Sequence, residues 1–156
     1  MSRLKKNAAA GALAVSLIGG FEGLRQNAYP DPGTHGKPWT VCYGATRVDG
    51  HEVHPGDHFS VPDCKALLVN DLETYANTVD ACTTVPLPDK RFVAFVSFAY
   101  NLGPARYCKS IAPLVNAGRT REACDKLLQF DRAAGVVLPG LRSRRQRERA
   151  FCVEGL

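Results

Sequence analysis

The sequence predicts a single α+β domain, with a small β-containing N-terminal lobe and a larger helical C-terminal lobe. Two observations lead to this fold class. Residues 27–59 are rich in Gly, Pro, His and Asp and contain short β-favouring segments. From residue 60 onward, apolar residues recur at helical spacing. At 156 residues the chain is long enough for one domain with a real core and too short for two ordinary ones.

The chain begins with a basic head, Arg3, Lys5 and Lys6, followed by an uncharged run of fourteen residues, 8–21. This order is typical of an export signal. As a helix the run would span roughly 21 Å, against about 30 Å for the hydrocarbon core of a bilayer, and most of its residues are Ala or Gly. We therefore expect an uncleaved export signal that holds weakly in a membrane. A signal peptide cleaved at Ala12-Leu13-Ala14 and an ordinary buried helix are the alternatives.

In the small lobe, the segment Trp39–Gly44 (WTVCYG) favours β structure and predicts a hairpin or a three-stranded sheet, to which we expect the N-terminal segment to attach. A helix is then expected to begin at Ser60, because Ser60 and Asp63 resemble a capping box and Pro62 lies in the first turn. Its apolar positions follow a helical period: Cys64, Leu67, Leu68, Leu72, Tyr75 and Val79.

Residues 89–102 (DKRFVAFVSFAYNL) are apolar on nearly every face beyond the first turn, which predicts a central buried helix that ends at Gly103. Shorter helices are expected over residues 110–116, closed by Gly118, and from a Thr120 cap through residue 130. A final basic helix is expected over residues 142–153. It carries the densest basic stretch of the chain: Arg142, Arg144, Arg145, Arg147 and Arg149.

The net charge of +5 and a pI of about 9.0 favour an anionic partner, which nucleic acid, an acidic glycan or a membrane surface would each satisfy. Six cysteines, an even number, suit a disulfide framework in an oxidising compartment. The alternative is six buried thiols in a cytosolic protein; the export signal favours disulfides. The chain contains no C-x-x-C pair and its histidines lack zinc-finger spacing, which argues against a structural zinc.

Three residues near the apolar run are candidates for glycoside hydrolysis, which needs two groups that flank one bond. Glu22 follows the run directly, and an apolar environment favours the protonated form that an acid catalyst needs. Asp31 lies in a turn bracketed by two prolines, and Thr40 begins the β segment. Taken alone, these residue types are common on protein surfaces, so their spacing does not establish a site.

A resemblance to a known family adds to this interpretation. The segments FEGLRQNAYPD (residues 21–31) and WTVCYGAT (residues 39–46) resemble the active-site region of phage lysozymes of glycoside hydrolase family twenty-four. They are most similar to the signal-anchor-release endolysins of lambdoid phages. The resemblance continues through VSFAYNLG (residues 96–103) and LPGLRSRRQRE (residues 138–148), which is similar to the family pattern GL-x-x-RR-x-x-E.

The resemblance implies a lysozyme-like fold, with residues 1–21 as a signal-anchor-release segment and residues 22–156 as one catalytic domain. Within that domain, residues 22–59 would form the β-containing lobe and residues 60–156 the helical lobe. The substrate would be peptidoglycan, and the host inner membrane would hold residues 8–21 before release. The protein would first span that membrane once, with its N-terminus in the cytoplasm, and then move to the periplasm as a monomer. No nucleic acid is expected as a partner.

The catalytic residues that the resemblance implies are Glu22, Asp31 and Thr40. Glu22 would be the acid, while Asp31 and Thr40 would activate water, so that the β-1,4 bond between N-acetylmuramic acid and N-acetylglucosamine is hydrolysed with inversion. Neither a cofactor nor a metal is implied. One departure concerns spacing: eight residues separate Asp31 from Thr40, where the family often has five. Thr34 is the alternative for the threonine role, although it lacks the WTVCYG context.

The resemblance and chain order also favour three disulfides, Cys42–Cys64, Cys82–Cys108 and Cys124–Cys152. Arg144 or Arg145 is expected to turn inward toward a carboxylate near the cleft, Glu22 being the candidate, while the other arginines stay solvated. Because the first cysteine is Cys42, no cysteine of the anchor segment is available to rearrange a blocking disulfide. Control of activity is therefore expected to depend on membrane topology.

Two other functions remain as alternatives. A lytic transglycosylase also uses one glutamate on the same polymer but would not need Asp31 or Thr40. A non-catalytic basic module would bind the cell wall or nucleic acid through the arginines of residues 142–149. No recognition motif accompanies these arginines, and basic helices more often form a solvated face over buried stems.

Overall fold

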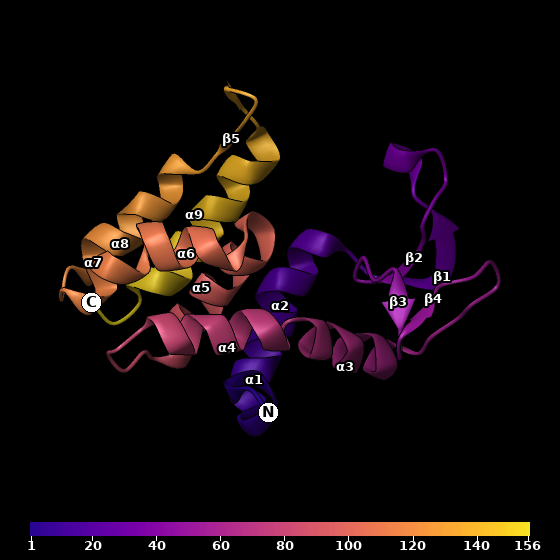
Figure 1. Cartoon of the computed structure of the whole chain (residues 1–156), viewed down its shortest axis with the longest axis horizontal. Coiled ribbons are helices and arrows are strands. Elements are labelled where there is room, and N and C mark those ends of the chain that lie inside the picture. The colour runs from indigo at the N-terminus through magenta and orange to yellow at the C-terminus, as the bar shows by residue number, and fades with distance from the viewer.

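The computed structural model describes all 156 residues, which form a helical lobe and a smaller β-containing lobe (Figure 1). The helices are α1 (Arg3–Lys6), α2 (Ala8–Glu22), α3 (Val61–Asp71), α4 (Glu73–Cys82), α5 (Asp89–Leu102), α6 (Pro104–Ser110), α7 (Ala112–Asn116), α8 (Thr120–Lys126) and α9 (Pro139–Val153), with 3-10 turns η1 (Pro32–Thr34) and η2 (Leu127–Gln129). The strands are β1 (Arg25–Pro30), β2 (Trp39–Cys42), β3 (Arg47–Val48), β4 (His51–Glu52), β5 (Arg132–Ala133) and β6 (Val136–Val137). They pair into three antiparallel hairpins, so the predicted α+β class is confirmed.

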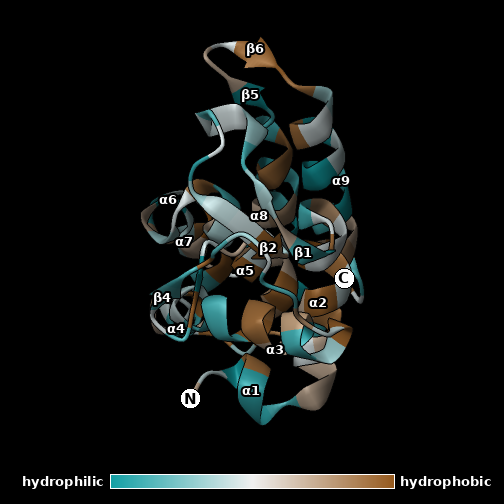
Figure 2. Cartoon of the chain, turned by 90° about the vertical axis from the view of Figure 1, so that its right-hand side faces the viewer, coloured by the Kyte–Doolittle hydropathy of each residue, from teal (hydrophilic) through white to brown (hydrophobic).

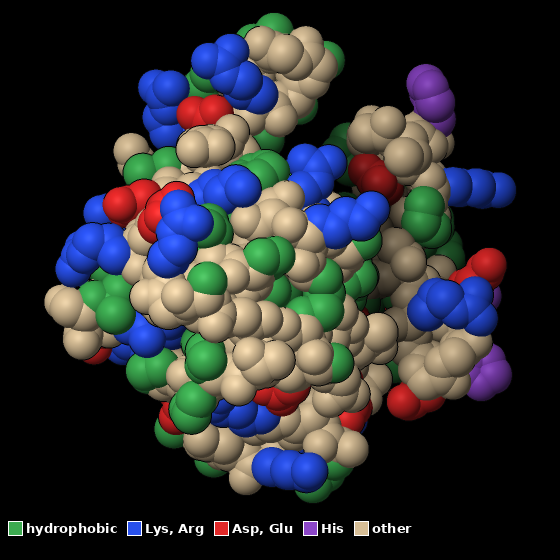
Figure 3. Space-filling view, turned by 60° about the vertical axis from the view of Figure 1, so that its left-hand side comes forward, with side chains coloured by type: hydrophobic (Ala, Val, Ile, Leu, Met, Phe, Trp, Pro, Cys, Tyr) green, Lys and Arg blue, Asp and Glu red, His purple; other side chains and the backbone are tan.

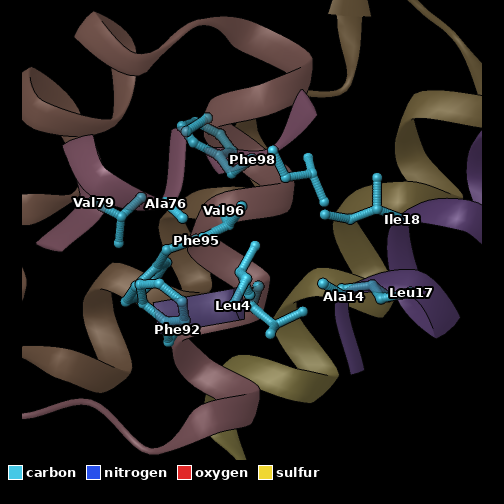
Figure 4. Close-up of a cluster of buried hydrophobic side chains, with 14 of the residues drawn as sticks. Leu4, Ala14, Leu17, Ile18, Ala76, Val79, Phe92, Phe95, Val96 and Phe98 are labelled. Atoms are coloured by element: carbon cyan, nitrogen blue, oxygen red, sulfur yellow. The ribbon is translucent and has the colours of Figure 1, made fainter. Parts of the chain in front are cut away.

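Helix α5 is the centre of the helical lobe, as its apolar sequence predicts. Its residues from Arg91 to Ala99 are all buried, and Phe92, Phe95 and Phe98 have no exposed surface. The helix ends at Gly103, whose φ of 97° few other residues adopt. Figure 4 shows these aromatic side chains among aliphatic ones from α1, α2 and α4. Burial of this kind contributes on the order of 25 cal/mol per Å² of apolar surface removed from water.

The N-terminal helices belong to the helical lobe, so the expectation that they attach to the small lobe is wrong. Leu4 of α1 and Leu17 and Ile18 of α2 lie in the same cluster as Phe92 of α5 (Figure 4). The physical reason is that one side of α2 is apolar enough to share the core of α5. After α2 the chain crosses into β1 and the small lobe. None of the helices combines the length and the apolar character that crossing a bilayer requires.

Two glycines allow neighbouring groups to pack closely against α2. A Cβ on Gly11 would lie 2.8 Å from the carbonyl oxygen of Leu4, where α1 folds back on α2. A Cβ on Gly19 would lie 3.0 Å from the ring of Tyr43, which follows β2. Both positions are buried, whereas Ala9, Ala12 and Ser16 face solvent. The glycines of this segment therefore contribute to packing as well as to its low hydrophobicity.

Several local predictions need correction. The expected single helix after Ser60 divides at Leu72 into α3 and α4, next to Asn70 and Asp71, whose side chains compete with helical hydrogen bonds. Ser60 does cap α3, accepting a hydrogen bond from the backbone N–H of Asp63 at 3.2 Å. Thr120, by contrast, is the first residue of α8 and does not cap it, and the helix expected through residue 130 becomes the 3-10 turn η2 after Lys126.

Helix α6 and the β5–β6 hairpin are among the elements that were not predicted from the sequence. Helix α6 begins at Pro104, a residue that suits the first turn of a helix. The β5–β6 hairpin turns at Ala134 and Gly135, which both have positive φ. Helix α9 is the predicted basic helix, and Figure 2 shows hydrophilic colour along it. It starts at Pro139, three residues before the predicted start.

Three disulfides connect neighbouring elements, and no cysteine is free. Cys42–Cys64 joins β2 to α3 and thus ties the small lobe to the helix that leads out of it. Cys82–Cys108 joins α4 to α6, and Cys124–Cys152 joins α8 to α9. These are the pairs that the family resemblance implies. Each closes a loop of 22 to 28 residues, which by chain entropy stabilises the fold by about 3–4 kcal/mol.

Candidate active site

Glu22 is the last residue of α2 and lies where the two lobes meet. Its side chain is 28% exposed. Gly44, just beyond β2, faces it closely, since a Cβ on Gly44 would lie 3.8 Å from Oε2 of Glu22. Figure 3 shows the molecular surface hollowed between the helical lobe and the β-containing lobe. Glu22 thus places a carboxyl group at the end of a helix, with its Oε2 facing the backbone of Gly44, which carries no side chain.

Arg144 of α9 holds the other oxygen of Glu22. Its Nη1 donates to Oε1 of Glu22 at 3.0 Å, and only 7% of its side chain is exposed. The guanidinium lies over the ring of Phe21, 4.6 Å from the centroid. Its Nη2 donates to the backbone carbonyl of Ser97 at 3.3 Å. Of the two arginines expected to turn inward, Arg144 is therefore the one that pairs with Glu22.

Glu148 lies behind Arg144 and has no exposed surface. Its Oε1 accepts hydrogen bonds from the Ser97 hydroxyl at 2.7 Å and from Nε of Arg144 at 3.3 Å. Its Oε2 lies 3.3 Å from Nε of Arg145. Burial raises the pKa of Glu148, while the two arginines and the Ser97 hydroxyl oppose that rise. The carboxyl group is thus enclosed between two guanidinium groups.

Arg145 is also buried but does not touch Glu22. Its Nη2 donates to Oδ1 of Asn101, and its guanidinium lies 5.2 Å from the centroid of the Phe98 ring. Burial lowers the pKa of Arg145, and the neighbouring Glu148 opposes this change. Arg142 and Arg147 are exposed, and Arg149 pairs with Asp125 at 2.7 Å. The five arginines of α9 are therefore not equivalent in their environments.

Asp31 and Thr40 lie on the β1–β2 hairpin. The register pairs Tyr29 with Thr40 and Pro30 with Trp39. Asp31 lies just beyond the end of β1, one residue past the last paired position, and is the N-cap of η1. Asp31 accepts a hydrogen bond from the N–H of Gly33 at 2.8 Å, and the buried Thr40 hydroxyl contacts the carbonyl of Pro38 at 3.4 Å.

The hairpin also brings Thr40 toward Glu22. Val41 and Ala45 exchange two backbone hydrogen bonds of 2.9 Å, so the chain turns sharply directly after Thr40. Gly44, which faces Glu22, lies inside this turn. No hydrogen bond or ion pair joins Glu22, Asp31 and Thr40 to one another. The structure thus brings the turn that follows Thr40 up to Glu22, while Asp31 lies just beyond the end of β1 in the same lobe.

The eight-residue spacing between Asp31 and Thr40 is taken up by a loop. That loop contains η1, followed by His35 and Gly36 with positive φ. Thr40 itself stays in strand register opposite Tyr29. Thr34, the alternative threonine, is exposed in this loop, and its hydroxyl donates to the carbonyl of Lys37.

The sequence interpretation missed several residues around Glu22. Ser97 and Glu148 were not singled out, although the first is the one serine in an apolar segment and the second ends the GL-x-x-RR-x-x-E pattern. Tyr100 was missed as well. Burial, with a contribution from the nearby Glu22 charge, raises the pKa of Tyr100 to about 12. An acidic residue four positions after an arginine in a predicted helix is the sequence signal that would have identified Glu148.

Comparisons with known proteins agree with this geometry. A family model described as phage lysozyme matches residues 19–148. The SAR-endolysin of Bacteriophage PS119 is 34% identical over 155 residues, covering 93% of this chain and 89% of that protein. The SAR-endolysin of Enterobacteria phage P21 is 32% identical, with coverage of 93% and 90%.

Solved structures show the same fold. The endolysin from Escherichia coli O157:H7 phage FAHEc1 has a TM-score of 0.81 at 27% identity, with 92% of each chain covered. The muramidase domain of SpmX from Asticaccaulis excentricus has a TM-score of 0.73 at 31% identity, covering 90% of this chain and 94% of that one.

Fold and comparisons together define a lysozyme-like protein of the glycoside hydrolase class. More narrowly, the chain belongs to the phage lysozyme family, and the relatives that it matches over most of its length are endolysins.

Proposed function

We propose that the protein is an endolysin with muramidase activity. It hydrolyses the β-1,4 bond between N-acetylmuramic acid and N-acetylglucosamine in peptidoglycan, which lyses the host cell and releases phage. The observation that carries this proposal is the position of Glu22 at the end of α2, paired with the buried Arg144 and next to the hairpin of Asp31 and Thr40. Similarity to a protein described as a muramidase domain supports the choice of bond.

Glu22 acts as the general acid. Arg144 occupies Oε1, so Oε2, on the side of Gly44, is the oxygen available to the substrate. From there the protonated carboxyl donates its proton to the glycosidic oxygen while the bond from that oxygen to the anomeric carbon breaks. The missing side chain at Gly44 leaves room for the sugar.

Asp31 and Thr40 hold the water that attacks the anomeric carbon from the opposite face. One carboxylate oxygen of Asp31 accepts from the N–H of Gly33, which fixes the group and leaves its other oxygen to take a proton from that water. Thr40 lies in the facing strand opposite Tyr29, and its hydroxyl orients the same water. The product is inverted, and no covalent intermediate forms. We expect the enzyme to act as a monomer.

Residues 8–21 anchor the protein in the inner membrane before release. The basic head stays in the cytoplasm, and Glu22 is held at the outer surface of the bilayer. In that state α2 is not packed on α5, so Glu22 is not beside Arg144 and the enzyme is inactive. After release into the periplasm, the segment folds as α2. Similarity to proteins named SAR-endolysins and the weak hydrophobicity of the segment support this sequence of events.

Digestion of purified sacculi, followed by mass spectrometry, tests the reaction. Hydrolysis adds one water per bond and gives reducing muramic acid ends, whereas a lytic transglycosylase gives anhydro ends. NMR of the first product anomer tests inversion. Glu22→Gln should abolish the activity while the protein stays folded, and normal lysis by that variant would overturn the proposal. Binding to sacculi or DNA without lysis would instead indicate a non-catalytic module.

A further inference from the structure

Glu148 is the one acidic side chain that is fully buried, and the proposed mechanism does not use it directly. A buried carboxylate is expensive unless charges and hydrogen bonds compensate it. Here Oε1 accepts hydrogen bonds from the Ser97 hydroxyl and Nε of Arg144, while Oε2 has no hydrogen bond and is compensated by the charge of Arg145, 3.3 Å away. The site is therefore built around this carboxylate.

The same guanidinium joins Glu148 to Glu22. Arg144 directs Nε toward Glu148 and Nη1 toward Glu22, at 3.3 and 3.0 Å. A guanidinium is planar and rigid, so fixing Nε also fixes the direction of Nη1. The Phe21 ring covers one face of the group, 4.6 Å from its central carbon. The orientation of Glu22 thus depends on contacts that lie on the far side of Arg144.

Charge balance leads to the same conclusion. Arg144 and Arg145 are adjacent and both buried. Glu148 offsets one of their charges, and Glu22 is the only other carboxylate that pairs with either arginine. Without Glu148, both guanidinium groups would compete for Glu22 or move toward water, and Arg144 would no longer hold its present position.

We propose that Glu148 is a positioning residue for Glu22, which it orients through Arg144, with Ser97 and Arg145 holding Glu148 in place. This inference rests on the proposed function, in which Glu22 is the acid. A merely structural role for Glu148 would lower stability but leave kcat of the folded protein unchanged. The two roles therefore differ in what substitution does to kcat once folding is accounted for.

The test is a double-mutant cycle on purified protein, with sacculi as substrate and kcat and KM measured separately. Glu148→Gln should lower kcat about tenfold or more with little change in KM, because substrate contacts stay intact. Arg144→Gln should lower kcat as well. In the double variant the losses should not multiply, because both changes break one path to Glu22. Glu122→Gln, which removes an exposed carboxylate that pairs only with Arg119, is the matched control and should leave kcat unchanged.

Thermal unfolding of each variant separates folding from catalysis. If Glu148→Gln does not fold, Glu148→Gln combined with Arg145→Gln carries the test, since it removes one buried charge of each sign. That variant should fold and keep the low kcat. Wild-type kcat in a folded Glu148 variant, or losses that multiply with Arg144→Gln, would overturn the proposal. Glu22→Gln in the same assay reports on the proposed function separately, because its retained activity would contradict the acid role whatever Glu148 does.

Discussion

Asp31 and Thr40 differ in how the hairpin holds them, and this difference predicts unequal losses on substitution. Asp31→Asn removes the base that takes the proton from water, so kcat on sacculi should fall by on the order of 10²–10⁴. Thr40→Ala removes only one of the groups that orient the water and should lower kcat less. Thr34→Ala should be near wild type, because its hydroxyl is bound to the loop backbone. A loss with Thr34→Ala but not with Thr40→Ala would move the threonine role to Thr34.

These residues also show what sequence can and cannot predict. Glu22, Asp31 and Thr40 lie within one short stretch, where local motifs carry the information. Glu148 and Ser97 lie 126 and 75 positions after Glu22, and only the packing of α5 against α9 brings them to it. The inward turn of Arg144 or Arg145 was predicted, but the choice of Arg144 as the partner of Glu22 and its contact with Ser97 were not. A long-range contact of this kind depends on helix packing, which spacing along the chain does not define.

Two tyrosines, the buried Tyr107 and the partly buried Tyr100, predict a loss of stability in alkali. Burial raises the pKa of Tyr107, like that of Tyr100, to about 12, from 10.0. Between these values the unfolded chain releases phenolic protons that the folded chain keeps, so stability falls as pH rises from about 10 to about 12. Thermal unfolding across this range should show the fall, and Tyr107→Phe should reduce it, because Phe does not titrate.

The matched control for this experiment is Thr83→Ala. It removes the same hydrogen bond, 2.6 Å between the Thr83 and Tyr107 hydroxyls, but keeps the phenol. Its alkaline fall should resemble that of the wild type. An identical pH dependence in Tyr107→Phe and wild type would show that Tyr107 does not contribute.

At the scale of elements, α1 is held on the helical lobe by charge as well as by Leu4. Arg3 donates to Asp89 at 2.5 Å and to the carbonyl of Leu87 at 2.8 Å, and its guanidinium lies over Phe92. Asn7 donates to both oxygens of Asp89 and also caps α2. The start of α5 thus carries an acceptor for the basic head of the chain.

This contact predicts that Asp89→Arg loosens α1 and α2. In purified protein, the free energy of unfolding should fall by about 1–2 kcal/mol, because the pair is half-buried and has further hydrogen bonds. The midpoint of thermal unfolding and the lytic activity should fall with it. Arg3→Asp should do the same, and the double variant should recover part of the loss. Asp89 lies outside the anchor segment, so its effect is independent of membrane insertion. No recovery in the double variant would mean that the pair does not hold α1.

The elements themselves were predicted unevenly, for physical reasons. The bounds of α5 follow from its continuous apolar sequence and Gly103, which are local signals. The separation of α3 from α4 at Leu72 was not visible, because the apolar period runs through it. That α2 belongs to the helical lobe was also missed, since an apolar face does not specify its partner.

At the scale of the whole molecule, the two faces of α2 predict separate effects on lysis. Ala9→Leu, Ala12→Leu and Ser16→Leu together add hydrophobicity on the exposed face, so purified protein should keep its activity while lysis in cells is delayed by tighter anchoring. Gly11→Leu and Gly19→Leu add side chains where Leu4 and Tyr43 already lie, so they should lower the activity of purified protein. Equal lysis timing for the native and exposed-face variants would argue against a membrane anchor.

The glycine contacts of α2 have a consequence for how lysis timing can evolve. Neighbouring residues pack against the buried side of the helix, so most substitutions there inactivate the enzyme and are removed by selection. The solvent side carries no such restriction, and under the proposed anchoring its residues affect the exchange of the segment between lipid and water. On the proposed function, a phage can therefore change when its host bursts through a few substitutions on one helix face, without altering how fast the enzyme cuts the wall. The lysis delay then depends on the solvent face of α2, and the rate of wall cleavage depends on the active site, so the two can vary independently.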